Sequence, residues 1–208
     1  MWVAWNINSE KILWPPPTIE EKIEIFYQRT LGWQLQIADL LANGGHPLGE
    51  SCTVRPLAHS GFAVLQICLS YFETIGHYED HGAPPRGVGS EAYFKKGVRS
   101  VFPQLLTNNN ENVVDELLAK LYGGARCGLY HNSMTVPNVG LGQPPGGEAM
   151  GYDPNTKLLA ISPERLPKAL KQHLESFRAH LLDPVNVQLR QNFERRFDHD
   201  NAIPAAKP

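Results

Sequence analysis

The stretch from Asn112 to Ala125 limits the fold more than any other, because apolar residues recur in it three and four positions apart. The apolar positions are Val113, Val114, Leu117, Leu118, Leu121, Tyr122 and Ala125. An α-helix turns once in about 3.6 residues, so side chains at this spacing share one face and need a partner surface to bury them. The stretch therefore predicts an amphipathic helix within a helical bundle.

Five further segments predict helices from their apolar spacing and their start signals. They are residues 18–43, opened by a Thr18 and Glu21 capping box; residues 62–77; residues 91–106, with Ser90 as the N-cap; residues 162–182, opened by Ser162-Pro163; and the segment after Asp183-Pro184. A hairpin is expected near 149–161, with a turn at Asp153-Pro154-Asn155, and the segment before it is expected to be a loop. The predicted fold is mainly α: an antiparallel helical bundle with a small β-hairpin and C-terminal helices.

The chain shows no internal repeat and no linker long enough to separate two domains. Residues 1–17 form a Trp- and Pro-rich arm that ends in three prolines, which forbid a helix and favour an extended chain. The helical domain is expected over residues 18–182 and includes the hairpin near 149–161. Residues 183–208 then supply a C-terminal helix and a tail.

Charge and cysteine content exclude several classes of protein. The formal net charge of −2 predicts no general attraction to a polyanion, so any contact with nucleic acid requires a local basic patch. Cys52, Cys68 and Cys127 are widely spaced, which argues against a disulfide framework and a zinc site. No apolar run approaches the roughly 18 residues that a membrane span needs. We expect a cytoplasmic protein with no membrane segment and no cofactor.

The residues that follow the 112–125 stretch carry the most suggestive chemistry. The chain reads Y-G-G-A-R-C-G-L-Y-H-N from Tyr122, which places Arg126 and His131 five positions apart. Arginine matches a phosphate with paired donors, and histidine can take or give a proton near neutral pH. Together they suit cleavage of RNA by its own 2′-hydroxyl, with His131 transferring the proton and Arg126 stabilising the charged phosphate oxygens.

A simpler interpretation of the same two residues stays open. Cationic side chains in the last turn of a helix stabilise it by about 0.3–1 kcal/mol through the helix dipole. In addition, five residues of an ideal helix place two side chains roughly 140° apart. Arg126 and His131 therefore converge only where the helix distorts or ends, which Gly123-Gly124 and Gly128 allow.

The motif resembles the signature of the HEPN superfamily, the higher eukaryote and prokaryote nucleotide-binding domains. In that family, an arginine, four to six further residues and a histidine end a late helix of an all-α bundle. The matching residues here are L-Y-G-G-A-R-C-G-L-Y-H, and the matching arrangement extends over about residues 18–182. The usual residue after the arginine is polar, whereas this chain has Cys127. The Arg-Cys-Gly-Leu-x-His wording is similar to that of poorly characterised bacterial HEPN-like proteins.

The resemblance implies a function and a set of site residues. Many HEPN proteins are metal-independent RNases of toxin-antitoxin, phage-defence or CRISPR systems and act as dimers. It implies that Arg126 and His131 are catalytic, and that polar residues of the second helix lie near them. The candidates for that auxiliary role are His77, Glu79 and His81.

Other residues are candidates for contact with RNA. Tyr130 can stack on a base, and Asn132 directly follows His131. The basic residues Lys95, Lys96 and Arg99 of the third helix form a second candidate surface. The alternative for these three is an ordinary solvated helix face.

Two alternatives to an RNase stay open. The first is a non-catalytic module that binds a nucleotide or a partner protein. The second is a metal-dependent helical hydrolase, because His77 and His81 have the i, i+4 spacing of metal ligands. A third ligand at a telling spacing is missing, so we expect no metal. The favoured hypothesis is an RNA-binding HEPN-like homodimer, a metal-independent endoribonuclease, with an antitoxin-like protein as a candidate partner.

Overall fold

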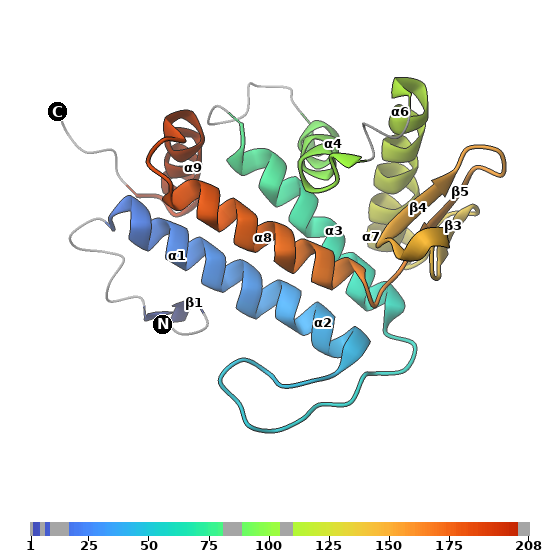
Figure 1. Ribbon diagram of the computed structural model, residues 1–208, viewed down its shortest axis with the longest axis horizontal. Helices are drawn as coiled ribbons and strands as arrows, with labels where there is room; N and C mark the ends of the chain where they lie inside the picture. The colour runs from blue at the N-terminus through green and yellow to red at the C-terminus, as the bar shows by residue number, and fades with distance from the viewer. Residues whose placement is uncertain (1, 5–6, 9–16, 81–88, 105–109, 204–208) are drawn as a thin grey trace.

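The computed structural model describes residues 2–4, 7–8, 17–80, 89–104 and 110–203. These residues form a mainly helical fold with a small three-stranded sheet at one end (Figure 1). The longer helical elements are α1 (Ile19–Thr30), η2 (Leu31–Leu35), α2 (Gln36–Asn43), α3 (Gly61–Tyr78), α4 (Ser90–Val101), α6 (Glu111–Ala119), η3 (Lys120–Cys127), α7 (Gly128–Asn132), α8 (Leu166–Leu182) and α9 (Val187–Asp200). The predicted fold class is thus confirmed as mainly α with a small β element. Among the described helices, none combines the length and apolar character that crossing a membrane requires.

The first predicted helix is confirmed, including its start and its end. Thr18 Oγ1 accepts a hydrogen bond from the Glu21 backbone, and the Glu21 carboxylate accepts one from the Thr18 backbone, which completes the capping box. The helix runs through α1, η2 and α2 and ends before Gly44, whose φ of 67° favours glycine. The middle segment, η2, is π-helical, which the sequence pattern did not predict.

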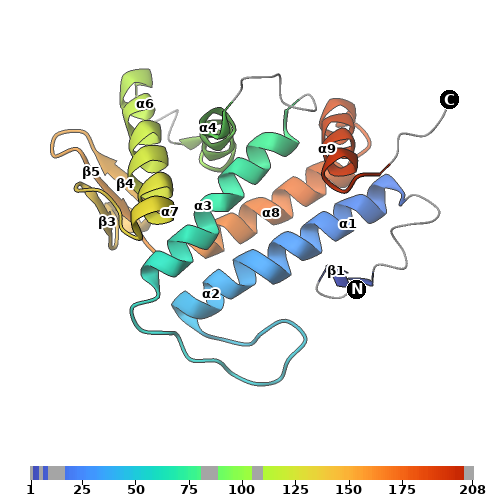
Figure 2. The ribbon, with the colours of Figure 1, turned by 180° about the vertical axis from the view of Figure 1, so that it is seen from behind.

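Helix α3 is the central element of the fold. Figures 1 and 2 show it beside α2 and α8, with α4 crossing it on another side. Two glycines allow the crossing with α4: a Cβ atom on Gly76 would collide with the Tyr93 carbonyl, and one on Gly97 would collide with the Phe72 carbonyl. The two backbones therefore touch where side chains would otherwise separate them.

Aromatic side chains fill the core where the C-terminal helix joins the bundle. Phe193 of α9 is fully buried, with its ring centroid 5.5 Å from that of Phe26 and 5.1 Å from that of Tyr78. Lys22 of α1 is also buried, and its ammonium group lies 2.7 Å from Glu194 and 2.8 Å from Asp198 of α9. Apolar packing and ion pairing thus hold α9 against α1 and α3.

The predicted hairpin is confirmed, but the sheet holds one strand more. Strands β4 (Met150–Asp153) and β5 (Leu158–Ile161) pair in antiparallel fashion, with Met150 opposite Ile161. Strand β3 (Val139–Leu141) pairs in parallel with β5, so the prediction of a loop before the hairpin was wrong at these residues. A strand of three residues is too short for a readable alternation, and its partner is distant in the sequence.

Three predicted helix boundaries need correction. Ser90 lies inside α4, Gly89 is the N-cap, and the helix ends at Val101 because Pro103 disfavours a helical Phe102. Helix α8 begins at Leu166 and not at Ser162, which instead accepts a turn hydrogen bond from the Arg165 backbone. For α4, residue 106, where the sequence predicted the end of the helix, lies outside the described residues.

The start of the last helix and the N-terminal arm also differ from the prediction in detail. Helix α9 begins at Val187, because Asp183 first closes a turn by accepting a hydrogen bond from the Val185 backbone. In the arm, β1 (Trp2–Ala4) and β2 (Ile7–Asn8) form a short antiparallel pair. Residues 9–16, including the first two prolines of the triplet, lie outside the described residues.

Candidate functional site

Arg126 lies near the end of a π-helical segment. Helix α6 starts at the Asn110 cap, whose side chain accepts from the Val113 backbone, and continues without a break through η3 and α7. The distortion that the two adjacent glycines allowed is present over Lys120–Cys127, whereas Gly128–Asn132 is regular α-helix. The distortion therefore turns the whole Arg126–Asn132 portion relative to α6 and does not bring His131 around toward Arg126.

The Arg126 side chain is held by one carboxylate and two aromatic rings. Its Nη2 atom lies 3.1 Å from Glu73 Oε2 and 3.4 Å from Ser90 Oγ. The guanidinium carbon lies 4.8 Å from the Tyr130 ring centroid and 5.6 Å from that of Tyr122. These distances are typical of cation-π contacts, so Arg126 is fixed in position on the side of the helix that faces α3.

Glu73 of α3 is the acidic centre of this arrangement. Its Oε1 atom lies 3.9 Å from His77 Nε2, one helical turn along α3. His77, Ser90 and Arg126 together outweigh burial and lower the pKa of the Glu73 carboxyl to about 2. Glu73 is therefore a carboxylate at any physiological pH and neutralises most of the charge that Arg126 brings.

His77 links the cluster to α4. Its ring stacks on that of Tyr93, with 4.0 Å between the centroids, and its Nδ1 atom is buried with no hydrogen-bond partner among the described residues. His77 is thus the one predicted auxiliary residue that the structure places beside Arg126, through Glu73. Glu79 instead accepts a hydrogen bond from Ser100, and His81 lies outside the described residues.

The structure places His131 and its neighbours on the surface. His131 and Asn132 are both exposed, and His131 makes no hydrogen bond or ion pair with any described residue. Tyr130 is 53% exposed and lies between the guanidinium of Arg126 and solvent. Of the residues predicted around the motif, Tyr130 therefore contacts Arg126, whereas His131 and Asn132 do not.

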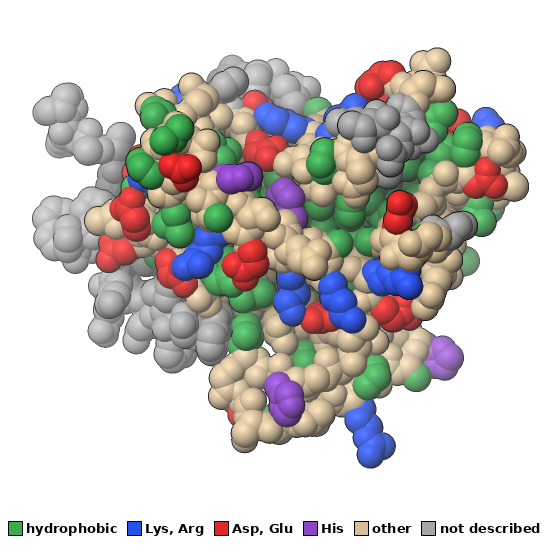
Figure 3. Space-filling model, viewed as in Figure 1, with side chains coloured by type: hydrophobic (Ala, Val, Ile, Leu, Met, Phe, Trp, Pro, Cys, Tyr) green, Lys and Arg blue, Asp and Glu red, His purple; other side chains and the backbone are tan. Residues whose placement is uncertain are grey.

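The basic residues predicted on the third helix are each paired with an acid. Lys95 lies 2.6 Å from Glu91, and Lys96 lies 3.3 Å from Asp80. Arg99 binds two carboxylates at 2.8 Å, those of Glu111 and Asp115. The charges along α4 are therefore compensated locally. In Figure 3, acidic and basic side chains are interspersed across the visible face in the same way.

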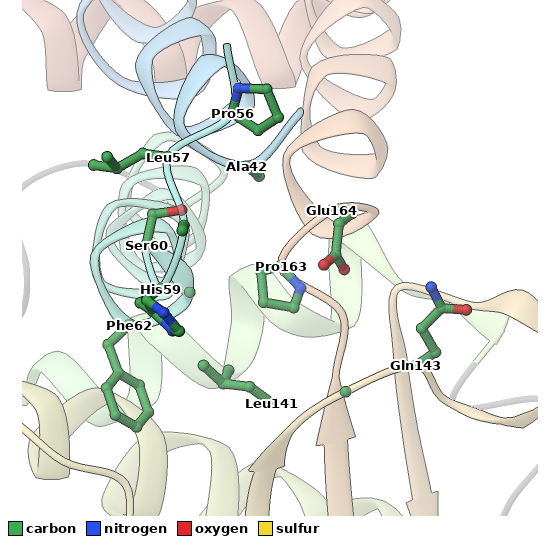
Figure 4. A pocket seen from close by; sticks show the side chains of 13 residues that line it. Ala42, Pro56, Leu57, His59, Ser60, Phe62, Leu141, Gln143, Pro163 and Glu164 are labelled. Atoms are coloured by element: carbon green, nitrogen blue, oxygen red, sulfur yellow. The ribbon is translucent and has the colours of Figure 1, made fainter. Parts of the chain in front are cut away.

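A second surface feature, a pocket, lies away from Arg126. It has a volume of about 800 Å³, and Figure 4 shows His59 and Phe62 on one side of it, Pro163 and Glu164 on the other, and Leu141 between them. Its hydroxyl and carboxylate are already engaged, because Ser60 donates to the Leu41 carbonyl and Glu164 accepts from Ser162. His59 and Gln143 are the other polar side chains that line the pocket.

The described residues contain no group of three or more His, Cys, Asp or Glu side chains arranged to hold a metal ion. Sequence reasoning missed Glu73 and Ser90 as partners of Arg126. The only local signal for Glu73 was its position four residues before His77, on the same face of one helix.

Comparison with protein-family models, curated proteins and solved structures returned no match.

Proposed function

We propose that this chain is a HEPN-like RNA-binding protein and that Arg126 and His131 form the centre of a metal-independent endoribonuclease site. The observation that carries the proposal is the placement of Arg126: one side of its guanidinium is fixed by Glu73, and the other lies against the exposed ring of Tyr130. A fixed arginine beside an exposed aromatic ring is suited to a nucleotide, because it offers a phosphate donor next to a surface on which a base stacks.

The residues would divide the chemistry as follows. His131 accepts the proton of the 2′-hydroxyl, whose oxygen attacks the adjacent phosphorus and displaces the 5′-oxygen of the next nucleotide. Arg126 stabilises the negative charge that develops on the phosphate oxygens. The leaving oxygen takes up a proton, so the products are a 2′,3′-cyclic phosphate and a 5′-hydroxyl. No metal is required at any step.

We propose further that the active form is a homodimer. His131 is exposed and makes no hydrogen bond or ion pair with any described residue, so its ring is free to face a second copy. A pair of histidines in one cleft would supply both the base and the acid that the reaction needs. A toxin-antitoxin or defence setting, with an antitoxin-like partner, follows from the HEPN resemblance.

Two observations favour a second candidate function, a non-catalytic nucleotide-binding module. Glu73 already neutralises Arg126, and His131 does not converge with Arg126 inside one chain. In this case the site would bind RNA or a nucleotide through Arg126 and Tyr130 without cleaving it. The two functions share the binding surface and differ only in the role of His131.

The test uses end-labelled single-stranded RNA of mixed sequence, incubated in EDTA with wild-type protein and with His131→Ala, Arg126→Ala and the control His180→Ala. His180 is also an exposed histidine, but it lies on α8. We expect cleavage by the wild type and by the control, with cyclic phosphate ends, and its loss in the other two variants. Binding without cleavage by all folded proteins would favour the second candidate. If the wild type neither binds nor cleaves the RNA, the proposal is refuted.

A further inference from the structure

A groove of about 350 Å³ lies beside the Arg126 site and shares the Tyr130 ring with it. We call it the Trp33–Tyr130 groove. Trp33 and Gln34 come from η2, Tyr130 comes from α7, and Gln66, Ile67 and Ser70 come from α3. The groove thus has a helical floor and two walls, and one of its walls is the ring that already contacts Arg126.

Both walls are aromatic side chains that the fold leaves exposed. Trp33 is 46% exposed and Tyr130 is 53% exposed, although large aromatic side chains ordinarily gain the most from burial. One side of the Tyr130 ring lies against the guanidinium of Arg126. A flat ligand in the groove would therefore stack on aromatic surface within one side chain of a cation.

The π-helical segments η2 and η3 border this same groove. Trp33 and Gln34 lie in the π-helical segment η2, and Tyr130 follows the π-helical segment η3 by three residues. A π-helical turn interrupts the regular hydrogen bonding of a helix and is frequently found at functional sites. In this chain the π-turns present the aromatic walls to each other across α3.

The polar side chains of the groove are neutral: the amides of Gln34 and Gln66 and the hydroxyls of Ser70 and Tyr130. Gln66 is exposed, and the Oε1 atom of Gln34 is buried without a hydrogen-bond partner among the described residues. An unpaired buried acceptor destabilises a protein, and a small rotation toward a ligand donor would supply the missing hydrogen bond. Glutamine amides both donate and accept, as the edge of a nucleobase requires.

Size and charge identify the occupant. About 350 Å³ lies at the lower end of ligand pockets, which suits one small flat group better than a length of peptide. None of the residues that line the groove is charged, whereas Arg126 lies directly behind Tyr130. A neutral flat ring joined to an anion fits both features, and a nucleotide is such a ligand.

We propose that the Trp33–Tyr130 groove holds one unstacked base of a single-stranded RNA and so selects the nucleotide whose phosphate lies at Arg126. This inference rests on the proposed function, because it assumes that the Arg126 site binds RNA. It adds a base-binding subsite formed by Trp33, Tyr130 and Gln66. A base held there would fix the position of its own ribose and phosphate beside Arg126.

The test measures the affinity of short single-stranded RNAs of each of the four bases for wild-type protein, Trp33→Leu and Phe62→Leu. Phe62 is a matched control, because it is 42% exposed and lines the other pocket. We expect Trp33→Leu to weaken binding of the preferred base by about 5-fold to 100-fold, the range for losing one stacking partner. Phe62→Leu should bind as the wild type does. Gln66→Leu should reduce discrimination among the bases.

The outcomes separate this inference from the proposed function. If the wild type binds RNA and Trp33→Leu binds equally well, the groove is not a base site, while the proposed function stands. If the wild type binds no RNA, both fail together. If Trp33→Leu changes only the molecular mass in solution, the groove is a contact between copies of the chain, and the inference is overturned.

Discussion

Glu73 and Arg126 are 53 positions apart in the chain and meet with 3.1 Å between the carboxylate and the guanidinium. The pair joins the central helix α3 to the π-helical segment that carries the candidate site. The carboxylate fixes the arginine in place, and it also competes with any phosphate for the same donors. Glu73 therefore gives the site its geometry at the expense of its affinity for anions.

Replacing this carboxylate should strengthen the binding of single-stranded RNA. In Glu73→Gln, Arg126 regains a full net charge and becomes available to one more phosphate. We expect the slope of log affinity against log salt concentration to steepen by about 0.7, the value for one phosphate contact on a single strand. Salt titrations of RNA binding measure this slope. Glu116→Gln is the control, since it frees Lys157 on another surface; equal slopes in both variants would contradict the prediction.

His173 should make the fold sensitive to mild acid. Burial, with a smaller contribution from His180, lowers the pKa of His173 to about 4 from an ordinary value of 6.5. Between pH 6.5 and 4 the unfolded chain therefore binds a proton that the folded chain does not, so stability falls as pH falls through this window. The loss is at most about 3 kcal/mol.

The variant His173→Gln tests this assignment. Glutamine can still meet the Tyr71 hydroxyl, which lies 2.8 Å from His173 Nδ1, but it does not titrate. Urea unfolding at several pH values should show a flatter dependence in the variant between pH 6.5 and 4. Glu73, with its pKa of about 2, contributes stability that is lost only below pH 4.5 and so leaves most of this window unaffected. An unchanged dependence would mean that another group is responsible.

The crossing of α3 and α4 should not tolerate a side chain at Gly97. A Cβ atom there collides with the Phe72 carbonyl, so Gly97→Ala forces the helices apart and should destabilise the fold by about 1–3 kcal/mol or more. Gly123→Ala is the matched control, because it is also a helical glycine but has open space around it. That change should be neutral or stabilising by up to about 1 kcal/mol. Thermal unfolding of both variants measures the difference, and equal effects would argue against close contact.

The buried ammonium of Lys22 should be important for attachment of α9. Lys22→Ala leaves Glu194 and Asp198 without their shared cation, and we expect a loss of about 1–3 kcal/mol, reduced from the fully buried case because both acids are partly exposed. Lys22→Met keeps the apolar stem in place and should lose less than the alanine variant. Urea unfolding gives both values. If Lys22→Met loses more free energy of unfolding than Lys22→Ala, packing of the apolar stem does not account for the difference between the two variants.

Local signals predicted most of the helices. The Thr18 and Glu21 capping box and the glycine after Asn43 act through contacts within a few residues, so they could be read directly from the sequence. Strand β3 could not, since its pairing with β5 depends on how distant segments pack. Apolar residues keep their helical spacing beyond Val101, whereas Pro103 ends α4 there because it disfavours a helical Phe102.

The candidate site was predictable only in part. The chemistry of Arg126 and His131 follows from their residue types, whereas the partner of Arg126 depends on the packing of α3 against η3. Glu73 therefore had no sequence signal of its own beyond its spacing from His77. Trp33 looked like one more apolar residue of the first helix, whereas the structure places it in the π-helical segment η2 with its side chain 46% exposed.

The π-helical segment η3 changes the direction in which the side chains after it point around the helix axis. A π-turn bonds residue i to i+5 and so holds one residue more than an α-turn, and one residue corresponds to about 100° of rotation in an α-helix. If the same residues formed a regular α-helix, the helix beyond η3 would be rotated by about this angle, and Tyr130 and His131 would point in another direction. The direction in which this chain presents its motif is thus set by the number of residues that precede it, as much as by their identity.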